Sequence, residues 1–400
     1  MSFVEVAEDQ LRLHILVGVA SLLLIVAVLW DAFETIVLPR RVTRRVRLTT
    51  FYYQITWTPW LTCVRLFRSR KRRELLLSVY GPLSLVLLIA LWAVGLVFGF
   101  GMLHWATGTR LNIPAEASGF TTYLYMSGVV FFTLGFGDVT PVEGMGRLLD
   151  VLEAGMGFGV LAIVIGYLPT LYQAFSRREA NISLLDARAG TPPTAAELIR
   201  RHGRGQNMDA LIKLLSDWEI WSADLMESHL SYPVLCFFRS QHDNQSWLSS
   251  LTTILDSCAL VMVGVDGAPP WQAQLTFAMA RHAVVDLTQI FNATPRAWTN
   301  ARLPSDELAR LRHSLAADNV PLRDGAEAEA RLTELRRMYE PYVDALAAHL
   351  AMPLPPWIHQ KDVVDNWQTS AWERNPQRVA ETVAHACQRA QVPKSKQVGN

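Results

Sequence analysis

Cysteine is scarce in this chain of 400 residues, and its four copies lie far apart. They form no CxxC or other paired spacing, which argues against a disulfide framework and against a metal site built from thiolates. We therefore expect free thiols at all four positions, which are Cys63, Cys236, Cys258 and Cys387. The chain also has no marked excess of positive or negative charge, because 37 basic residues balance 36 acidic ones. The net charge says little about partners, and no nucleic-acid partner is expected.

Hydropathy divides the chain near residue 175, with an apolar half before it and an ordinary half after it. A bilayer core needs about 20 residues of apolar helix, and residues 14–38, 79–104 and 145–175 meet this length. The first stretch is too long for a secretory signal, follows an acidic leader and has no small-residue cleavage site. We expect three membrane spans, which place the two termini on opposite sides.

The connector between the first two spans is rich in basic residues and has no acidic residue from 40 to 73. Its basic residues are Arg40, Arg41, Arg44, Arg45, Arg47, Arg65, Arg68, Arg70, Lys71, Arg72 and Arg73. Such a loop is expected on the cytosolic side, so the N-terminus is predicted outside and the C-terminal half in the cytosol. Because no organelle-targeting segment stands out, we expect a bacterial inner membrane, with anionic lipid headgroups contacting residues 40–73.

Between the two arginine clusters, residues 48–64 are uncharged, aromatic and interrupted by Pro59. A fourth span here would leave one arginine cluster outside, so we predict a helix at the membrane interface. The three-residue spacing of arginines in each cluster is also found in voltage sensors. Neither cluster has the apolar surroundings of a spanning sensor helix, which favours charges that face solvent and lipid headgroups.

The loop between the second and third spans contains an apolar segment that is too short to cross the membrane. A helix over 120–132 followed by an extended 133–137 would enter the membrane and return. Non-helical backbone at this depth requires surrounding protein or a water-filled cavity, which implies a pore. Gly135 and Gly137 can adopt backbone angles closed to other residues, so that successive carbonyl oxygens turn toward one axis and replace the water of a cation.

Residues 133–138 read Thr-Leu-Gly-Phe-Gly-Asp and are followed by Pro141 and by Gly146-Arg147 at the start of the third span. In this context the sequence resembles the potassium channel family over about residues 79–175. The resemblance implies a homotetramer in which each subunit supplies one filter loop. It implies K⁺ coordination by the backbone carbonyls of Thr133, Leu134, Gly135 and Phe136 and by the Thr133 hydroxyl, with Gly137 and Asp138 completing the filter.

Three residues depart from the commonest pattern of that family. Phe136 replaces a tyrosine whose hydroxyl bonds to pore-helix aromatics, Val129 replaces a glutamate that pairs with the aspartate matching Asp138, and Phe132 replaces a threonine. We therefore expect selectivity to survive, with Asp138 held differently and filter stability changed.

Glycine and proline in the third span indicate where the pore is gated. Alignment from Arg147 places Gly157 at the family's hinge, although the alternative is close packing through a small-residue face of Gly155 and Gly159. Pro169 is expected to kink the helix near its cytosolic end and to shape an inner gate.

Acidic residues also lie within the spans. Asp31 and Glu34 are expected to pair with Arg40 or Arg41, whereas Glu153 either faces the pore or lies behind the filter as a protonated hydrogen-bond donor.

The second half is predicted to be helical after a linker that runs from Arg178 to Pro193. Thr194 and Glu197 form a capping-box pattern, and an apolar segment at 251–265 is interpreted as a buried core helix. The predicted helices cover 195–203, 207–230, 246–264, 271–292, 305–317, 325–350 and 376–391. No nucleotide-binding or metal-binding spacing occurs there, and ordinary roles are expected for His229, His242, His282 and His359.

These patterns define an all-α membrane protein with four segments, at 1–38, 39–78, 79–178 and 179–400. The leading hypothesis is a tetrameric K⁺-selective channel with no cofactor other than the permeant ion and no enzymatic activity. The alternatives are a weakly selective cation channel and a membrane-anchored adaptor or enzyme with a non-conducting pore module. Nothing in the second half identifies the gating stimulus.

Overall fold

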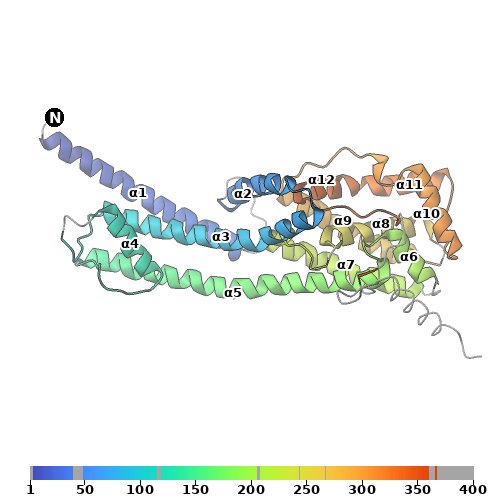
Figure 1. Cartoon of the computed structure of the whole chain (residues 1–400), viewed down its shortest axis with the longest axis horizontal. Coiled ribbons are helices and arrows are strands. Elements are labelled where there is room, and N and C mark those ends of the chain that lie inside the picture. Colours follow the sequence, from blue (N-terminus) through green and yellow to red (C-terminus); the bar gives the residue numbers. More distant parts are fainter. Residues whose placement is uncertain are drawn as a thin grey trace, which may run out of the picture. The chain divides into compact units, whose positions relative to one another are not determined.

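A computed structural model describes residues 3–38, 48–114, 119–204, 208–242, 244–265, 267–359 and 365–366. These residues are helical apart from loops and two isolated β-bridges. They fall into two compact units, Met1–Gln173 and Ala174–Asn400 (Figure 1). The all-α fold predicted from the sequence is confirmed.

The first unit is built from four helices and the start of a fifth. They are α1 (Phe3–Ile36), α2 (Leu48–Arg65), α3 (Arg70–Ala106), α4 (Phe120–Phe131) and the beginning of α5 (Gly144–Ala189). By length and composition, Glu8–Ile36, Arg70–Ala106 and Gly144–Ala189 could each cross a membrane. These helices contain the three predicted spans except for residues 37 and 38, which lie beyond the end of α1. The chain is an all-α membrane protein.

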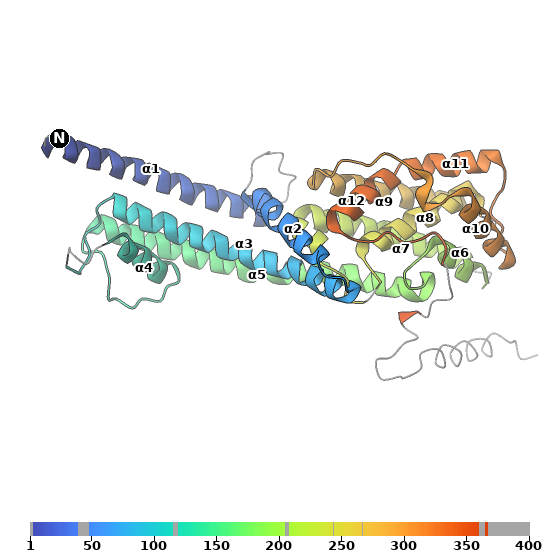
Figure 2. The same ribbon diagram turned by 45° about the horizontal axis from the view of Figure 1, so that its top comes forward.

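Helix α1 lies along α3, and α4 packs against the later part of α3 (Figure 2). Two glycines on α3 allow the close approach of α1. A Cβ atom added at Gly95 would lie 3.1 Å from Cγ2 of Val28, and one added at Gly99 would lie 2.7 Å from Cγ1 of Ile25. Small residues at such spacing bring membrane helices together without any hydrophobic driving force.

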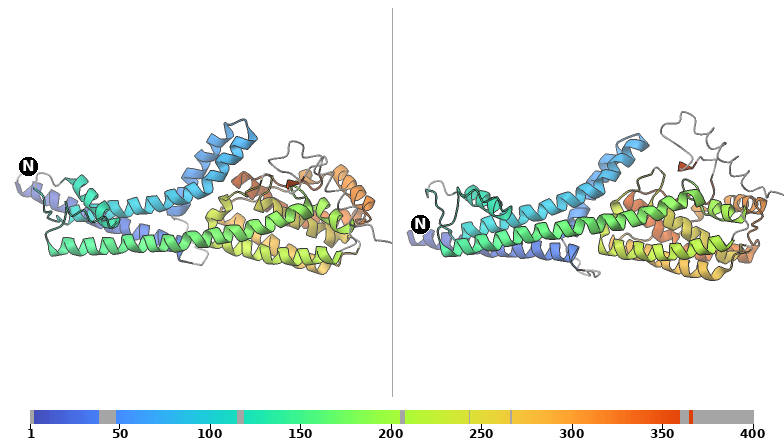
Figure 3. Two further views of the ribbon diagram at one scale, coloured as in Figure 1. Left: turned by 60° about the horizontal axis from the view of Figure 1, so that its bottom comes forward. Right: turned by 90° about the horizontal axis from the view of Figure 1, so that it is seen from below.

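Helix α2 packs against the first third of α3, and the two form a hairpin (Figure 3). Tyr52 donates from Oη to the Ser84 carbonyl at 2.8 Å, and Trp60 donates from Nε1 to the Leu76 carbonyl at 3.2 Å. At 1.5 Å per residue α3 is about 55 Å long, which exceeds a bilayer core of about 30 Å. The start of α3 therefore has room to extend beyond the apolar core together with α2.

The tip of this hairpin is basic. Arg65, Arg68, Lys71, Arg72 and Arg73 are all exposed there. The other predicted cluster, between Arg40 and Arg47, lies outside the described residues. Asp31 and Glu34 were expected to pair with that cluster, but the described partners differ.

Asp31 is buried and accepts hydrogen bonds from Thr49 Oγ1 at 2.6 Å and from Trp92 Nε1 at 3.0 Å. Glu34 accepts one from Trp30 Nε1 at 2.7 Å. The Asp31 carboxylate thus joins α1, α2 and α3.

The second unit contains the end of α5 and a bundle of shorter helices. They are α6 (Ala195–Arg204), α7 (Met208–Ser231), η2 (Pro233–Phe237), α8 (Trp247–Gly264), α9 (Pro270–Ile290), η3 (Asn300–Arg302), α10 (Ser305–Ala317), α11 (Ala326–Arg337) and α12 (Glu340–Leu350). Helix α8 could cross a membrane by length and composition, but 89% of that window is buried inside the protein. This burial agrees with its interpretation as a core helix.

Two predictions for this unit are wrong. Residues 179–189 belong to α5, whereas a linker was predicted from Arg178 onward. One helix predicted over 325–350 is two, because α11 ends at Arg337 and α12 begins at Glu340 with Pro341 in its first turn, a position that proline favours. The predicted helix at 376–391 lies outside the described residues.

Buried charges organise the interior of the second unit. Arg302 contacts Asp256 at 2.7 Å and Glu340 at 3.1 Å, Arg336 contacts Glu340 at 3.0 Å, and Tyr339 donates to Asp256. Burial alone would lower the pKa of Arg302, but the facing carboxylates raise it. Burial raises the pKa of Glu340 in spite of its two arginines.

Candidate functional site

The short helix α4 and the chain that follows it form the candidate site. The helix was predicted at 120–132 and is observed at Phe120–Phe131. It approaches α3 closely, since a Cβ atom added at Gly101 would lie 3.2 Å from the Leu124 Cα atom. Ser127 Oγ lies 2.7 Å from the Val97 carbonyl oxygen of α3. These contacts hold α4 against the long apolar helix α3.

Backbone angles alternate through the segment that follows α4. Thr133, Gly135 and Gly137 have φ values of 52°, 64° and 74°, whereas Leu134 and Phe136 between them are not among the residues with positive φ. A chain that alternates between left-handed and ordinary angles turns successive peptide planes so that their carbonyl oxygens lie on one side. Glycine adopts such angles without strain, which explains the two glycines at 135 and 137.

The two ends of this segment are fixed to the rest of the pore loop. At the start, the Leu134 amide donates to the Val129 carbonyl at 2.9 Å. At the end, Tyr125 Oη donates to Asp138 Oδ2 at 2.9 Å, and the Thr140 amide donates to Asn112 Oδ1 at 2.9 Å. Asp138 is thus held by a tyrosine on α4, at a position where sequence analysis expected a departure from the family pattern.

The segment itself is not covered by its own chain. Leu134 and Phe136 are 54% and 64% exposed, and a Cβ atom added at Gly135 or Gly137 would meet nothing within 4 Å. A segment buried within its own chain would have covered side chains and close neighbours around its glycines. The segment is therefore exposed on the surface of the single chain.

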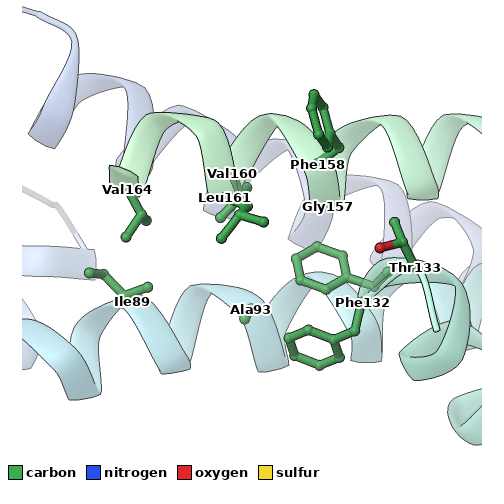
Figure 4. A pocket seen from close by; sticks show the side chains of 10 residues that line it. Ile89, Ala93, Phe132, Thr133, Gly157, Phe158, Val160, Leu161 and Val164 are labelled. Atoms are coloured by element: carbon green, nitrogen blue, oxygen red, sulfur yellow. The ribbon is translucent and has the colours of Figure 1, made fainter. Parts of the chain in front are cut away.

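Next to the end of α4, an apolar pocket lies between α3 and α5 (Figure 4). Its lining includes Ile89 and Ala93 from α3, Phe132 and Thr133 from the loop, and Leu161 and Val164 from α5.

Gly157 on α5 is a packing position. A Cβ atom added there would lie 2.0 Å from the backbone carbonyl oxygen of Phe131, at the end of α4. Sequence analysis assigned close packing to Gly155 and Gly159 instead, but a Cβ atom at either would meet nothing within 4 Å of this chain. A hinge at Gly157 remains a prediction, and the structure supplies a separate reason for its glycine. Pro169 lies inside an uninterrupted α5, and its role as an inner gate also remains a prediction.

Glu153 on α5 is buried behind α4 and does not line the exposed segment. Its Oε1 atom forms a short hydrogen bond with Ser127 of α4, and Oε2 lies 3.9 Å from His104 Nε2. His104 Nε2 also lies 3.3 Å from Asp150 Oδ1. Of the two locations left open for Glu153, the structure favours the one behind the filter. Sequence reasoning missed His104 and Asp150, although an ionisable residue within a span is itself a signal of function.

Histidines of the second unit have ordinary surroundings. His229 is buried and accepts from Arg178 Nη1 at 3.0 Å, His282 pairs with Asp286 at 3.4 Å, and His359 contacts the Pro192 carbonyl at 2.8 Å. His242 is exposed.

Cys63, Cys236 and Cys258 are free thiols, and Cys387 lies outside the described residues. Thr194 Oγ1 caps α6 by accepting from the Glu197 amide at 3.2 Å, which is half of the predicted capping box.

Comparison with known proteins agrees with this arrangement. Residues 85–174, which run from α3 through α4 into α5, match a family model described as an ion channel. The fold and this match define a multi-pass membrane protein with an ion channel domain, which indicates a role in ion transport.

Three relatives extend the comparison. The uncharacterized membrane protein YdjJ of Bacillus subtilis (strain 168) is 22% identical over 191 residues, which cover 47% of this chain and 55% of that protein. Protein LctB of Geobacillus stearothermophilus is 31% identical over 84 residues, covering 18% of this chain and 62% of that protein. Protein LctB of Bacillus caldotenax is 29% identical over 84 residues, with the same shares. The chain thus spans less than two thirds of these relatives, and no solved structure matches it.

Proposed function

We propose that the chain is one subunit of a tetrameric, K⁺-selective channel whose filter is residues 133–138. The observation that carries the proposal is the alternation of φ at Thr133, Gly135 and Gly137, directly after a short helix between two long apolar helices. A potassium filter needs rings of carbonyl oxygens from four loops around one axis. One chain supplies one loop, so four copies are required.

Each filter residue has a role in this proposal. The carbonyls of Thr133, Leu134, Gly135 and Phe136 and the Thr133 hydroxyl coordinate K⁺ in place of water. The carboxyl end of α4 carries partial negative charge and favours a cation beneath the filter. Asp138, held by Tyr125, fixes the outer end of the segment.

Exposed apolar surface supports assembly. Helix α5 leaves large apolar side chains uncovered on more than one side. They include Met145, Leu148, Val151, Leu152, Phe158, Leu161, Ile163 and Ile165. Lipid covers part of this surface in the proposed channel, and the α5 helices of other copies cover the rest.

The proposed topology places the N-terminus outside and the basic tip of the α2–α3 hairpin in the cytosol. Exposed arginines there attract anionic headgroups of the inner leaflet. The proposed segments remain 1–38, 39–78, 79–178 and 179–400, with the last one in the cytosol.

Gating is proposed to act through α5, which supplies residues to both compact units. Its end is anchored in the second unit, where the buried Arg178 donates to the Leu235 and Phe238 carbonyls at 2.9 Å. A stimulus that rearranges this anchor acts on the helix that carries Gly157 and Pro169.

Potassium-driven flux from liposomes containing the purified full chain tests the proposal, with sodium-only vesicles and Ba²⁺ block as controls. Barium-sensitive flux that strongly favours K⁺ supports it. Equal K⁺ and Na⁺ flux favours a weakly selective cation channel. A protein that is dimeric by mass in detergent contradicts the four-loop filter.

A further inference from the structure

A buried cluster of three ionisable side chains lies at one end of the first unit, beside α4. His104 comes from the last turn of α3, and Asp150 and Glu153 come from the start of α5. One ligand atom of each lies within 4.8 Å of the others. His104 and Glu153 are fully buried, whereas the Asp150 side chain is 20% exposed and offers a route from solvent.

The three atoms that face one another form no hydrogen bond, although His104 Nε2 lies within ion-pair distance of both carboxylates. His104 Nε2, Asp150 Oδ1 and Glu153 Oε2 are buried and make no hydrogen bond with the described part of the chain. A buried polar atom that forms no hydrogen bond is unfavourable. Three such atoms that converge on one point are arranged as the donors of one shared cation would be.

The remaining atoms of the His104 and Glu153 side chains are satisfied by neighbours. His104 Nδ1 lies 3.2 Å from Thr109 Oγ1, and Glu153 Oε1 is bonded to Ser127. Histidines that bind a metal hold their other ring nitrogen in this way, and metal-binding carboxylates are also hydrogen-bonded by a second layer of groups. The cluster thus has both the inward-facing atoms and the supporting bonds of a metal site.

The donor set selects the class of metal. One imidazole nitrogen and two carboxylate oxygens suit zinc, which binds three protein ligands and a water in many sites. Ligands about 2.0–2.1 Å from a tetrahedral zinc ion lie about 3.3–3.4 Å apart. The His104–Asp150 separation of 3.3 Å meets this value, and the His104–Glu153 separation of 3.9 Å is close to it. Calcium, which takes 6–8 oxygen ligands, fits poorly.

We propose that His104, Asp150 and Glu153 bind a divalent transition metal of the zinc class, one ion per chain. Such an ion joins α3 to α5 directly behind α4, and Ser127 links the site to α4 itself. The inference goes beyond K⁺ conduction and does not depend on it, because it concerns binding of a different cation at a site away from residues 133–138.

Zinc binding to the full chain in detergent micelles tests the proposal. The purified protein is stripped with a chelator and titrated with ZnCl₂ in competition with a chromogenic chelator. We expect one tightly bound zinc per chain, with one nitrogen and two oxygens from protein in its X-ray absorption spectrum. His104→Gln should abolish this binding, and Thr109→Val should weaken it by about 10–100-fold.

His14→Gln is the matched control. His14 lies near the same end of the unit, stacked on Trp105, and is not part of the cluster. The control should keep full zinc stoichiometry. If His104→Gln does not fold, Asp150→Asn at the partly exposed ligand replaces it. Absence of a stoichiometric zinc in the wild-type chain overturns the proposal, as does zinc that persists in both His104→Gln and Asp150→Asn.

Discussion

Both units of this chain contain apolar helices, but the two units differ in how much of the apolar surface they bury. The first unit leaves large apolar side chains such as Leu16, Leu23 and Val94 exposed on α1 and α3, whereas the second unit buries Leu251, Ile254 and Leu255 completely on α8. Lipid is the solvent that suits the first pattern, and water suits the second. An apolar helix alone does not identify a membrane span, because α8 is apolar and lies in a protein core.

The two units also differ in how they bind their buried carboxylates. The first unit keeps its buried carboxylates few and local, as with Asp31 and Glu153, and each is bonded to side chains of adjacent helices. The second unit joins Arg302, Asp256 and Glu340 into one buried ionic network. Buried carboxylates of the first unit are thus bound singly by neighbouring side chains, whereas those of the second unit belong to one ionic network.

The largest expected effect is loss of selective current when the filter backbone is altered. Gly135→Ala or Gly137→Ala places a side chain at φ values of 64° and 74°, which strains the carbonyl arrangement. We expect selectivity or current to be abolished, measured as the reversal potential in potassium gradients. Gly119→Ala is the control, since Gly119 lies in the same loop with an ordinary φ of −82°. An unchanged reversal potential in both filter variants contradicts the filter assignment.

Breaking the charge network should be the largest stability change in the second unit. Arg302→Met leaves Asp256 and Glu340 buried with too few partners, and removing one side of a buried pair costs about 3–5 kcal/mol. Arg312→Met is the control, because its partners Asp324 and Glu329 are 77% and 51% exposed and such pairs contribute at most about 1 kcal/mol. Denaturant unfolding of both variants measures the difference. An equal decrease in the free energy of unfolding in both variants would show that the buried network contributes no more than an exposed ion pair.

A smaller loss is expected at the contact between α4 and α5. Gly157→Ala drives a methyl group into the Phe131 carbonyl oxygen, and such overpacking costs about 1–3 kcal/mol. We expect a lower Tm of the full chain, whereas Gly155→Ala two residues away should not lower the Tm, because its Cβ meets nothing and alanine favours a helix over glycine. A hinge role without packing predicts instead that Gly157→Ala changes channel open probability at constant Tm.

The smallest expected effect is acid sensitivity of the second unit. Burial, and then the charge of Arg178, hold the pKa of His229 well below its usual value. As the pH falls, the His229 imidazole is therefore protonated in the unfolded chain before it is protonated in the folded chain. The free energy of unfolding is at its full value above about pH 6.5 and decreases below it, by up to about 1.4 kcal/mol per pH unit. Unfolding measured against pH should be less steep in His229→Gln than in the wild type or in a variant of the exposed His313. An identical pH dependence would exclude His229 as the cause.

The membrane helices were predictable because the bilayer sets the length and composition of a span. Helix α4 was predictable to within one residue at each end, since 120–131 is apolar but too short to cross a membrane. Helix α8 was also assigned correctly to a core, from its short length and from Asp256 within it.

Contacts distant in sequence account for what the sequence did not predict. Helix α5 runs on to Ala189 because Arg178 is buried against residues 229–238, a contact that no local pattern encodes. The packing role of Gly157 depends on where α4 ends, and the cluster of His104, Asp150 and Glu153 depends on how α3 lies beside α5. The break before Glu340 did have a local signal, since Pro341 favours the first turn of a helix.

The most direct test of the central claim is the bi-ionic reversal potential of the purified wild-type channel in a planar bilayer, with K⁺ on one side and Na⁺ on the other. A K⁺ filter at residues 133–138 predicts a large potential whose sign corresponds to K⁺ permeation, and its loss in Gly135→Ala but not in Gly119→Ala. A reversal potential near zero in the wild-type channel would contradict the account.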